Sequence, residues 1–217
     1  MASFDLSRFI VEVSIWAVPT VFSIVLHELM HGVVARQLGD DTAQRAGRLT
    51  LNPISHIDAF GTILLPAMLL LFHLPVFGYA KPVPVDFRRL RSPRSGMVMV
   101  AIAGPLTNLA LAILSSVGAH ALLAHLGPGS PRMIVVPLIY MLQASVIVNI
   151  ALGVFNLVPL LPLDGGRVLV GMLPLYLARP FARMERYGML LLLLLLYSGV
   201  FTRIIDPVIG AATRILL

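Results

Sequence analysis

The sequence contains no cysteine and few charged residues. The absence of cysteine excludes disulfide bonds and metal sites built from thiolates. Only 12% of the 217 residues are charged, whereas a soluble domain usually carries about a quarter, and 58% are hydrophobic. Only 10 residues are acidic, so each candidate carboxylate can be weighed individually.

Three further features are missing. Asp5 and Glu12 interrupt the first apolar stretch, and no small-residue cleavage site follows it, so we expect no cleaved signal peptide. No internal repeat is visible, which argues against a transporter built from duplicated halves. The basic residues behind the net charge of +6 flank apolar segments, and they form no basic surface with aromatic side chains between them. This pattern argues against nucleic acid as a partner.

Long apolar runs are what the sequence does contain. They lie at about 9–35, 59–79, 96–126, 132–162 and 187–201. Each approaches or exceeds the roughly 18–20 residues that span a bilayer. We therefore predict an all-α polytopic membrane protein, with residues 1–217 forming a single integral-membrane domain of about four to six transmembrane helices.

Local signals refine this outline. A glycine stop predicts that the first long helix covers residues 5–38. Prolines 159 and 162 prevent the span that begins at Met133 from continuing as a helix. Further expected elements are a short strand at 48–51, a short or interfacial helix over 167–186 and a last span containing Leu190–Leu196.

Residues 59–79 are apolar but are interrupted by Pro66 and Pro75. The basic segment 81–94 lies in the cytoplasm by the positive-inside rule, and the first helix is expected to end on the same side. Residues 59–79 then re-enter the membrane rather than cross it, although a crossing stays open. Broken backbone at membrane depth must be covered by protein.

The stretch "LHELMHG" places polar groups inside the first apolar helix. Each charge or imidazole at membrane depth costs on the order of 2.5–3.5 kcal/mol. His27 and His31 are four residues apart, so both imidazoles project from one helix face at the spacing that a zinc ion requires. Glu28 holds the general-base position of this motif, from which it can accept a proton from an activated water. The alternative is a pair of histidines that only hydrogen-bond to neighbouring helices.

A zinc hydrolase needs a third protein ligand. Glu12 is 15 residues from the first histidine on the same helix, about 22 Å away, and cannot close the site. His56 and Asp58 lie in a polar loop and stay open as ligands. Asp164 is favoured because it ends a membrane span, where a buried carboxylate is costly unless paired or metal-bound. The glycines at 165–166 allow close approach of the backbone.

Three asparagines form a second polar layer. Asn149 and Asn156 are seven residues apart on one span, and Asn108 lies on the preceding one. Intramembrane asparagines commonly link helices. Asn156, near Asp164, and Asn108 are nevertheless candidates for binding the substrate or the oxyanion.

With these motifs in place, the sequence resembles the site-2 protease family of intramembrane zinc metalloproteases. The resemblance depends on "HELMH", "AGPLTN" and "FNLVPLLPLDGG" in that order, and on the connecting segments "GRLTLNPISHIDAFGTILLP" and "GYAKPVPVDFRRLR". It covers most of residues 20–170. The connecting segments are similar to the compact prokaryotic branch, which has neither a PDZ nor a CBS domain.

The resemblance implies a small set of functional residues. It implies one Zn²⁺ per chain held by His27, His31 and Asp164, with Glu28 as the catalytic glutamate. It also implies that Asn156 contributes to binding of the substrate or transition state.

The resemblance further implies the substrate and the location. The segment around 78–85 is similar to a membrane-associated β strand that pairs with an unwound substrate, so we expect a small β segment there. Expected partners are membrane-spanning protein substrates and the lipid bilayer, in a prokaryotic inner membrane with the active site toward the cytoplasm. Only about 26 residues precede the motif, so an N-terminal span seen in some members is not expected.

Other functions stay open at this stage. A zinc or other divalent-metal transporter also places histidines and carboxylates in membrane helices. A catalytically inactive scaffold could share the fold, and a zinc enzyme such as a prenyl-protein peptidase shares the short motif. A regulatory membrane partner is a further hypothesis, and the oligomeric state is not specified by the sequence.

Overall fold

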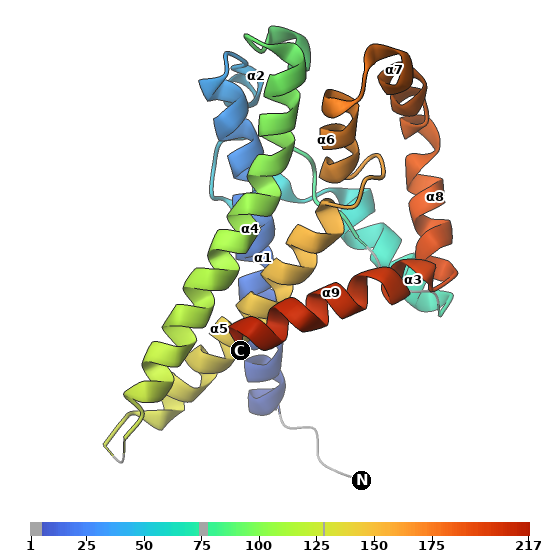
Figure 1. Ribbon diagram of the computed structural model, residues 1–217. Coiled ribbons are helices and arrows are strands. Elements are labelled where there is room, and N and C mark those ends of the chain that lie inside the picture. The colour runs from blue at the N-terminus through green and yellow to red at the C-terminus, as the bar shows by residue number, and fades with distance from the viewer. Residues whose placement is uncertain (1–5, 74–77, 128) are drawn as a thin grey trace.

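The computed structural model describes residues 6–73, 78–127 and 129–217, and among them it contains helices and loops but no strand (Figure 1). The α-helices are α1 (Leu6–Gln37), α2 (Thr42–Arg45), α3 (Leu65–Leu71), α4 (Pro93–Ala124), α5 (Arg132–Asn156), α6 (Asp164–Met172), α7 (Leu175–Arg183), α8 (Glu185–Tyr197) and α9 (Val200–Leu216). The shorter elements are the 3₁₀-helices η1 (Pro53–His56) and η3 (Phe87–Arg89) and the π-helix η2 (Ala59–Leu64). The predicted all-α class is confirmed.

Helices α1, α4 and α5 pack against one another and form the centre of the molecule. Each is long and apolar enough to cross a membrane. In the described part of the chain, α8 and α9 add a fourth candidate span only if they are taken together, because they are bent by 76°. The protein is therefore a polytopic membrane protein whose described residues hold three to four candidate spans, compared with the four to six expected.

Buried polar side chains join the three central helices. Asn149 is fully buried on α5 and donates to the hydroxyl of Ser23 on α1 over 2.8 Å. The hydroxyls of Ser115 on α4 and Ser145 on α5 lie 2.8 Å apart. Such bonds between helices, worth about 0.6–2 kcal/mol each in membranes, fix which faces meet.

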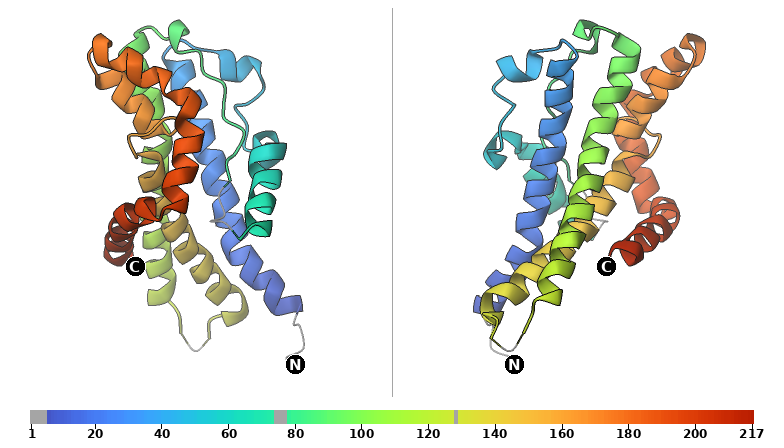
Figure 2. Two further views of the ribbon diagram at one scale, coloured as in Figure 1. Left: turned by 90° about the vertical axis from the view of Figure 1, so that its right-hand side faces the viewer. Right: turned by 60° about the vertical axis from the view of Figure 1, so that its left-hand side comes forward.

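Residues 59–71 form a short helical segment that does not cross the membrane by itself. Its 13 residues rise about 20 Å, less than the roughly 30 Å hydrocarbon core. The chain then returns alongside its own path, because the Tyr79 amide donates to Gly61 O (3.0 Å) and the Lys81 amide to His56 O (2.9 Å). The chain therefore folds back on itself here, as the re-entrant alternative expects (Figure 2). The end of the predicted apolar run, residues 74–77, lies outside the described residues.

The two β segments expected from the sequence, at 48–51 and around 78–85, are not strands in the described part of the chain. Residues 78–86 are extended, but their backbone groups bond to isolated partners, such as Asp86 N to the Asp40 carboxylate (2.7 Å). Pro82 and Pro84 lack the N–H groups that a ladder would need. Residues 78–86 are therefore one extended segment without a paired strand among the described residues.

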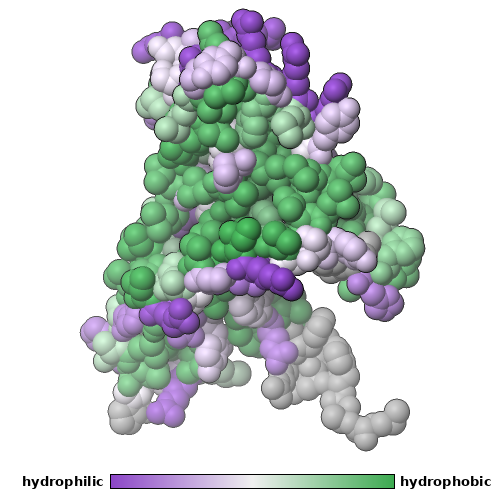
Figure 3. Space-filling view, turned by 45° about the vertical axis from the view of Figure 1, so that its right-hand side comes forward, coloured by the Kyte–Doolittle hydropathy of each residue, from purple (hydrophilic) through white to green (hydrophobic). Residues whose placement is uncertain are grey.

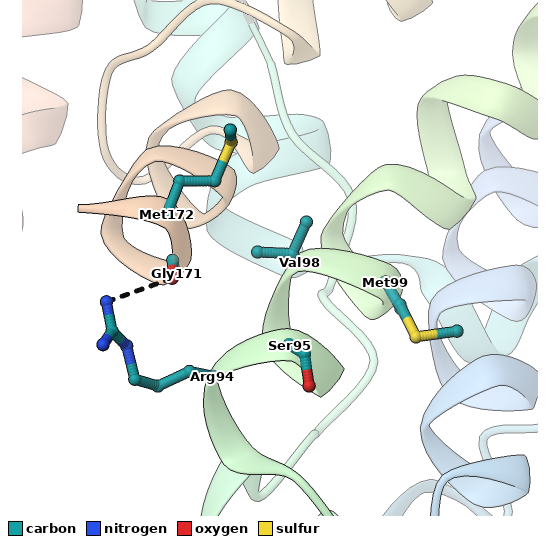
Figure 4. Close-up of a pocket in the computed structure, with 6 residues that line it drawn as sticks. All are labelled: Arg94, Ser95, Val98, Met99, Gly171 and Met172. Atoms are coloured by element: carbon teal, nitrogen blue, oxygen red, sulfur yellow. Dashed lines mark hydrogen bonds between the residues drawn. The ribbon is translucent and has the colours of Figure 1, made fainter. Parts of the chain in front are cut away.

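Helix α2, the start of α4 and α7 lie together at one end of the molecule (Figure 1), and this end is hydrophilic (Figure 3). A broad hydrophobic band lies below it (Figure 3). The helix predicted over 167–186 is instead the pair α6 and α7. At this end Arg94 donates to the carbonyls of Gly171 (3.3 Å) and Leu173, across a shallow groove of about 620 Å³ (Figure 4). This contact ties the start of α4 to the end of α6.

Helix α8 covers the loop that joins α5 to α6. A Cβ at Gly188 would lie 2.1 Å from Leu161 O, so the two backbones are in direct contact. Beside this contact, Leu163 packs with apolar side chains of α8 and α9, namely Leu192, Phe201 and Ile205. Only glycine fits at the crossing point.

This packing predicts opposite effects for two glycine-to-alanine substitutions. Gly188→Ala should lower Tm because its new methyl group meets backbone that cannot yield easily. Gly210→Ala in α9, where nothing lies within 4 Å of the added Cβ, should leave Tm unchanged or raise it, since alanine favours a helix by about 0.5–1 kcal/mol. Thermal unfolding in detergent measures both. Equal shifts for the two variants would contradict the packing at Gly188.

Candidate metal centre

Three side chains from distant parts of the chain converge at one point. His27 and His31 project from α1, and Asp164 is the first residue of α6. Asp164 Oδ2 lies 3.1 Å from His27 Nε2 and 3.2 Å from His31 Nε2, and the two Nε2 atoms are 3.0 Å apart. The spacing of the histidines and the carboxylate favoured in the sequence thus meet in one group.

The outer nitrogens of the two imidazoles determine what the inner nitrogens can do. His27 Nδ1 lies 2.6 Å from Asn108 Oδ1, and His31 Nδ1 lies 2.7 Å from Val100 O. Both oxygens can only accept, so each Nδ1 carries the hydrogen and each Nε2 directs a lone pair inward. Asp164 Oδ2 is buried and accepts no hydrogen bond from the described residues. Three electron-pair donors therefore face one another, an arrangement that a cation stabilises.

The separations suit zinc. Ligand atoms about 2.0–2.1 Å from a tetrahedral zinc ion would lie roughly 3.3 Å apart, close to the observed 3.0–3.2 Å. The backbone of α4 presses closely on the centre, because a Cβ at Gly104 would lie 2.5 Å from His31 Nε2 and 2.6 Å from His27 Nε2, so only glycine fits beside the imidazoles. Two imidazoles and a carboxylate are donors that zinc commonly uses. The residues present fit the ion.

The loop before α6 brings Asp164 to the histidines. A Cβ at Gly165 would lie 2.2 Å from Leu157 O, and one at Gly166 would lie 2.5 Å from Leu161 N. The first turn of α6 is thus pressed against the loop that precedes it. The close backbone approach expected at 165–166 is present.

Glu28 lies beside this group on the wall of a large cavity. The cavity has a volume of about 1260 Å³ and is also lined by His27, His31, Asn156 and Asp164. The backbone amide of Val83 donates to Glu28 Oε2 over 2.9 Å. The extended segment that carries this amide forms another part of the wall.

The two asparagines considered for substrate binding occupy different places. Asn156 lines the cavity, and its amide donates to Leu152 O of its own helix over 3.0 Å. Asn108 is fully buried behind His27 and donates to Asn149 Oδ1 over 2.8 Å. This placement differs from the expected substrate contact and matches the interhelical role left open for it.

The other residues kept open as ligands are occupied elsewhere. The ring Nε2 of His56 lies 3.0 Å from Thr50 O, and Asp58 accepts from the amides of Phe60 and Gly61 at the start of η2. Neither joins the group that could hold a metal. Sequence reasoning missed the role of Gly104, for which glycine followed by proline inside an apolar helix was the available signal.

The close approach of Gly104 to the two imidazoles predicts that Gly104→Ala abolishes metal binding. The added methyl group would clash with both imidazoles and displace the nitrogens that face the centre, so purified protein should lose the single zinc ion expected per chain. Gly153→Ala is the matched control, because its added Cβ would make ordinary contacts of 3.6 Å. Elemental analysis of both variants checks this. One zinc ion in Gly104→Ala would contradict the assigned centre.

The hydrogen bond between His27 Nδ1 and Asn108 Oδ1 predicts that Asn108→Ala weakens metal binding less than Gly104→Ala does. Loss of the acceptor should reduce zinc affinity by about 10–100-fold, as is typical when a partner of a metal-ligating histidine is removed. Asn156→Ala should change the affinity less than threefold, because the described bond of Asn156 stays within its own helix. Competition with a chelator measures both affinities. Equal losses would show that Asn108 does not act through His27.

Comparisons with known proteins agree with the site. Peptidase family M50 matches residues 131–198, which include Asn156 and Asp164. The chain is 36% identical over 198 residues to "Putative zinc metalloprotease YwhC" of Bacillus subtilis, covering 88% of this chain and 84% of that protein. No solved structure matches the chain.

Two longer relatives match over part of their length. "Putative zinc metalloprotease Rip3" of Mycobacterium tuberculosis is 34% identical over 70% of this chain and 29% of its own length. "Zinc metalloprotease MJ0392" of Methanocaldococcus jannaschii is 28% identical over 71% of this chain and 34% of its own length. The chain thus spans about a third of these two proteins. The near full-length match to the Bacillus protein, together with the metal centre, places the chain in peptidase family M50, the site-2 protease family, as a zinc metalloprotease.

Proposed function

We propose that this metalloprotease hydrolyses peptide bonds within membrane-spanning segments of other proteins. The observation that carries the proposal is the depth of the centre. His31 and His27 are six and ten residues before the end of α1, or about 9 and 15 Å along its axis. A hydrocarbon core is about 30 Å thick, so the centre would lie at membrane depth.

The cavity suits an unwound peptide. Its volume of about 1260 Å³ exceeds the roughly 300–1000 Å³ of small-molecule pockets. A substrate helix in lipid satisfies its own backbone hydrogen bonds and hides its peptide carbonyls. It must therefore unwind before cleavage, and the polar groups on the wall of this largely apolar cavity would give the unwound backbone new partners.

The wall of the cavity supplies those partners. The extended residues 78–86 can align a peptide by β-augmentation, in which backbone groups give affinity. Asn156 lies on the same cavity and is the residue proposed to contact the substrate or the oxyanion. Asn108, behind His27, holds the imidazole instead.

The chemistry follows from the position of Glu28. A zinc ion held by His27, His31 and Asp164 would polarise the scissile carbonyl and lower the pKa of water in the site. Glu28 takes a proton from the attacking water and delivers it to the leaving amine. The Val83 amide anchors one carboxylate oxygen of Glu28, which leaves the other to exchange the proton.

The orientation follows from the basic end of the molecule. The positive-inside rule places the arginines of α2, the start of α4 and α7 in the cytoplasm. The centre would then open toward the cytoplasmic side of a prokaryotic inner membrane. Membrane-spanning proteins are the proposed substrates.

Glu28→Gln tests this function. The purified variant should hold one zinc ion per chain, like the wild type, but should cut none of a panel of single-span substrates that the wild type cuts. The reason is that glutamine preserves the shape of the side chain and cannot accept the proton. Product bands and their masses measure cleavage, and elemental analysis measures zinc.

Chelation and zinc add-back serve as controls, together with Asp164→Ala, which should lose zinc and activity. Cleavage by Glu28→Gln, or cleavage that survives chelation, would contradict the mechanism. Cuts confined to residues outside the spanning segments would contradict the intramembrane substrate. Zinc flux into protein-loaded vesicles without any cleavage would favour the transporter.

A further inference from the structure

Helix α9 departs sharply from the direction of α8. The two helices are bent by 76°, and the bend lies at Ser198 and Gly199, where Gly199 has a φ of +69°. Only glycine adopts this backbone conformation readily. The apolar run that begins in α8 is therefore not continued as one straight span.

One face of α9 packs on the protein. Phe201 and Ile205 are 6% exposed and contact the cluster around Leu163 and Leu192. Further along the helix, Ile209, Ala212 and Leu216 pack against the cluster formed by α4 and α5. These residues recur every three or four positions, so they form one stripe.

A second face is apolar and exposed. It consists of Val200, Ile204, Val208, Ala211 and Ile215. Ile204 is 67% exposed and Ile215 is 83% exposed. An exposed aliphatic stripe along the whole length of a helix needs an apolar environment, which the described residues do not supply here.

A third face is polar and exposed, and it carries Arg203, Asp206 and Arg214. Three stripes on one helix therefore meet three surroundings: protein, an apolar phase and water. A helix that crosses a bilayer would bury this polar stripe in hydrocarbon, at a cost of about 2.5–3.5 kcal/mol per charged group near the centre.

We propose that α9 does not cross the bilayer but lies in the membrane plane, at the border between acyl chains and headgroups. This border is on the membrane face opposite the hydrophilic end of the molecule, which α2, the start of α4 and α7 form. Its apolar stripe contacts lipid, and its arginines reach the headgroups. This proposal is independent of the proteolytic function.

The dimensions agree with this position. The 13 residues of α8 rise about 20 Å, which is short of the roughly 30 Å hydrocarbon core. Arg183 ends α7 and Arg186 lies in the first turn of α8, whereas Arg203 and Arg214 lie beyond the other end of α8. Long basic side chains extend from the apolar layer to the headgroups and can supply the missing length at both borders.

The surface pattern gives independent support. In the view of Figure 3 the hydrophobic band has a hydrophilic cap above it, and hydrophilic side chains gather again along its lower part. Helix α4, which contacts α9, also exposes apolar side chains such as Leu114 and Val117. An apolar phase around the molecule would solvate the exposed side chains of both helices.

The absence of cysteine makes a direct test possible, because single cysteines can be introduced for nitroxide labels without removing native ones. Labels at Ile204, Val208 and Ile215 should show oxygen accessibility above that of a water-soluble nickel reagent, in vesicles of neutral and anionic phospholipid. Labels at Arg203 and Arg214 should show the reverse. The depths at 204 and 215 should agree within a few ångströms.

A spanning α9 gives a different result, since residues 204 and 215 would differ in depth by about 16 Å along the helix. That outcome would overturn the proposal. Labels at 204, 208 and 215 that both reagents fail to reach would overturn it too, and would indicate a second copy of the chain on this face. Labels accessible to nickel at all positions would show that α9 lies in water.

Sidedness provides a second measurement. An impermeant thiol reagent should modify Arg214→Cys from the side opposite to that from which it modifies Arg179→Cys in α7. Both side chains are exposed. Modification of both from the same side would contradict a position at the far membrane face. Wild-type elution from a sizing column shows that each variant is folded.

Discussion

The meeting of one carboxylate with two imidazoles inside an apolar helix bundle is the constraint on which the rest of the structure depends. An ionised carboxylate removed from water costs several kcal/mol unless charge and hydrogen bonds compensate for it. Asp164 Oδ2 lies within 3.2 Å of both His27 and His31 and accepts no hydrogen bond from the described residues. A cation between the carboxylate and the two imidazoles would make their close approach favourable. The packing around these three side chains holds them in this arrangement.

Glycines make the arrangement possible at the backbone level. Gly104 lets α4 approach the imidazoles, and Gly188 lets α8 rest on the loop before Asp164. Behind the imidazoles, a polar chain runs from His27 through Asn108 and Asn149 to a serine of α1. The three central helices α1, α4 and α5 thus hold the centre together, and a displacement of any one of them would shift the histidines.

The sequence predicted those parts of the site that depend on local geometry. The spacing of His27 and His31 fixes their common helix face, and the scarcity of carboxylates pointed to Asp164. The position of Gly104 against the imidazoles could not be predicted, because it depends on how α1 and α4 cross. The last apolar run was expected to be a span, and the structure divides it at Gly199 into α8 and α9, a turn that an aliphatic run does not encode. The strand expected around 78–85 is absent from the described residues, because Pro82 and Pro84 lack the backbone N–H groups that pairing with a second strand would need.

Those prolines have a consequence for any peptide that lies along the extended segment. The amides on one edge are already used within the protein, and they belong to residues 79, 81 and 83. On the other edge Ala80, Pro82 and Pro84 offer three carbonyls but only one N–H, since proline has none. This edge therefore accepts hydrogen bonds and scarcely donates them. A peptide aligned there would be held by its own N–H groups, while its carbonyls would stay free of backbone partners and open to attack.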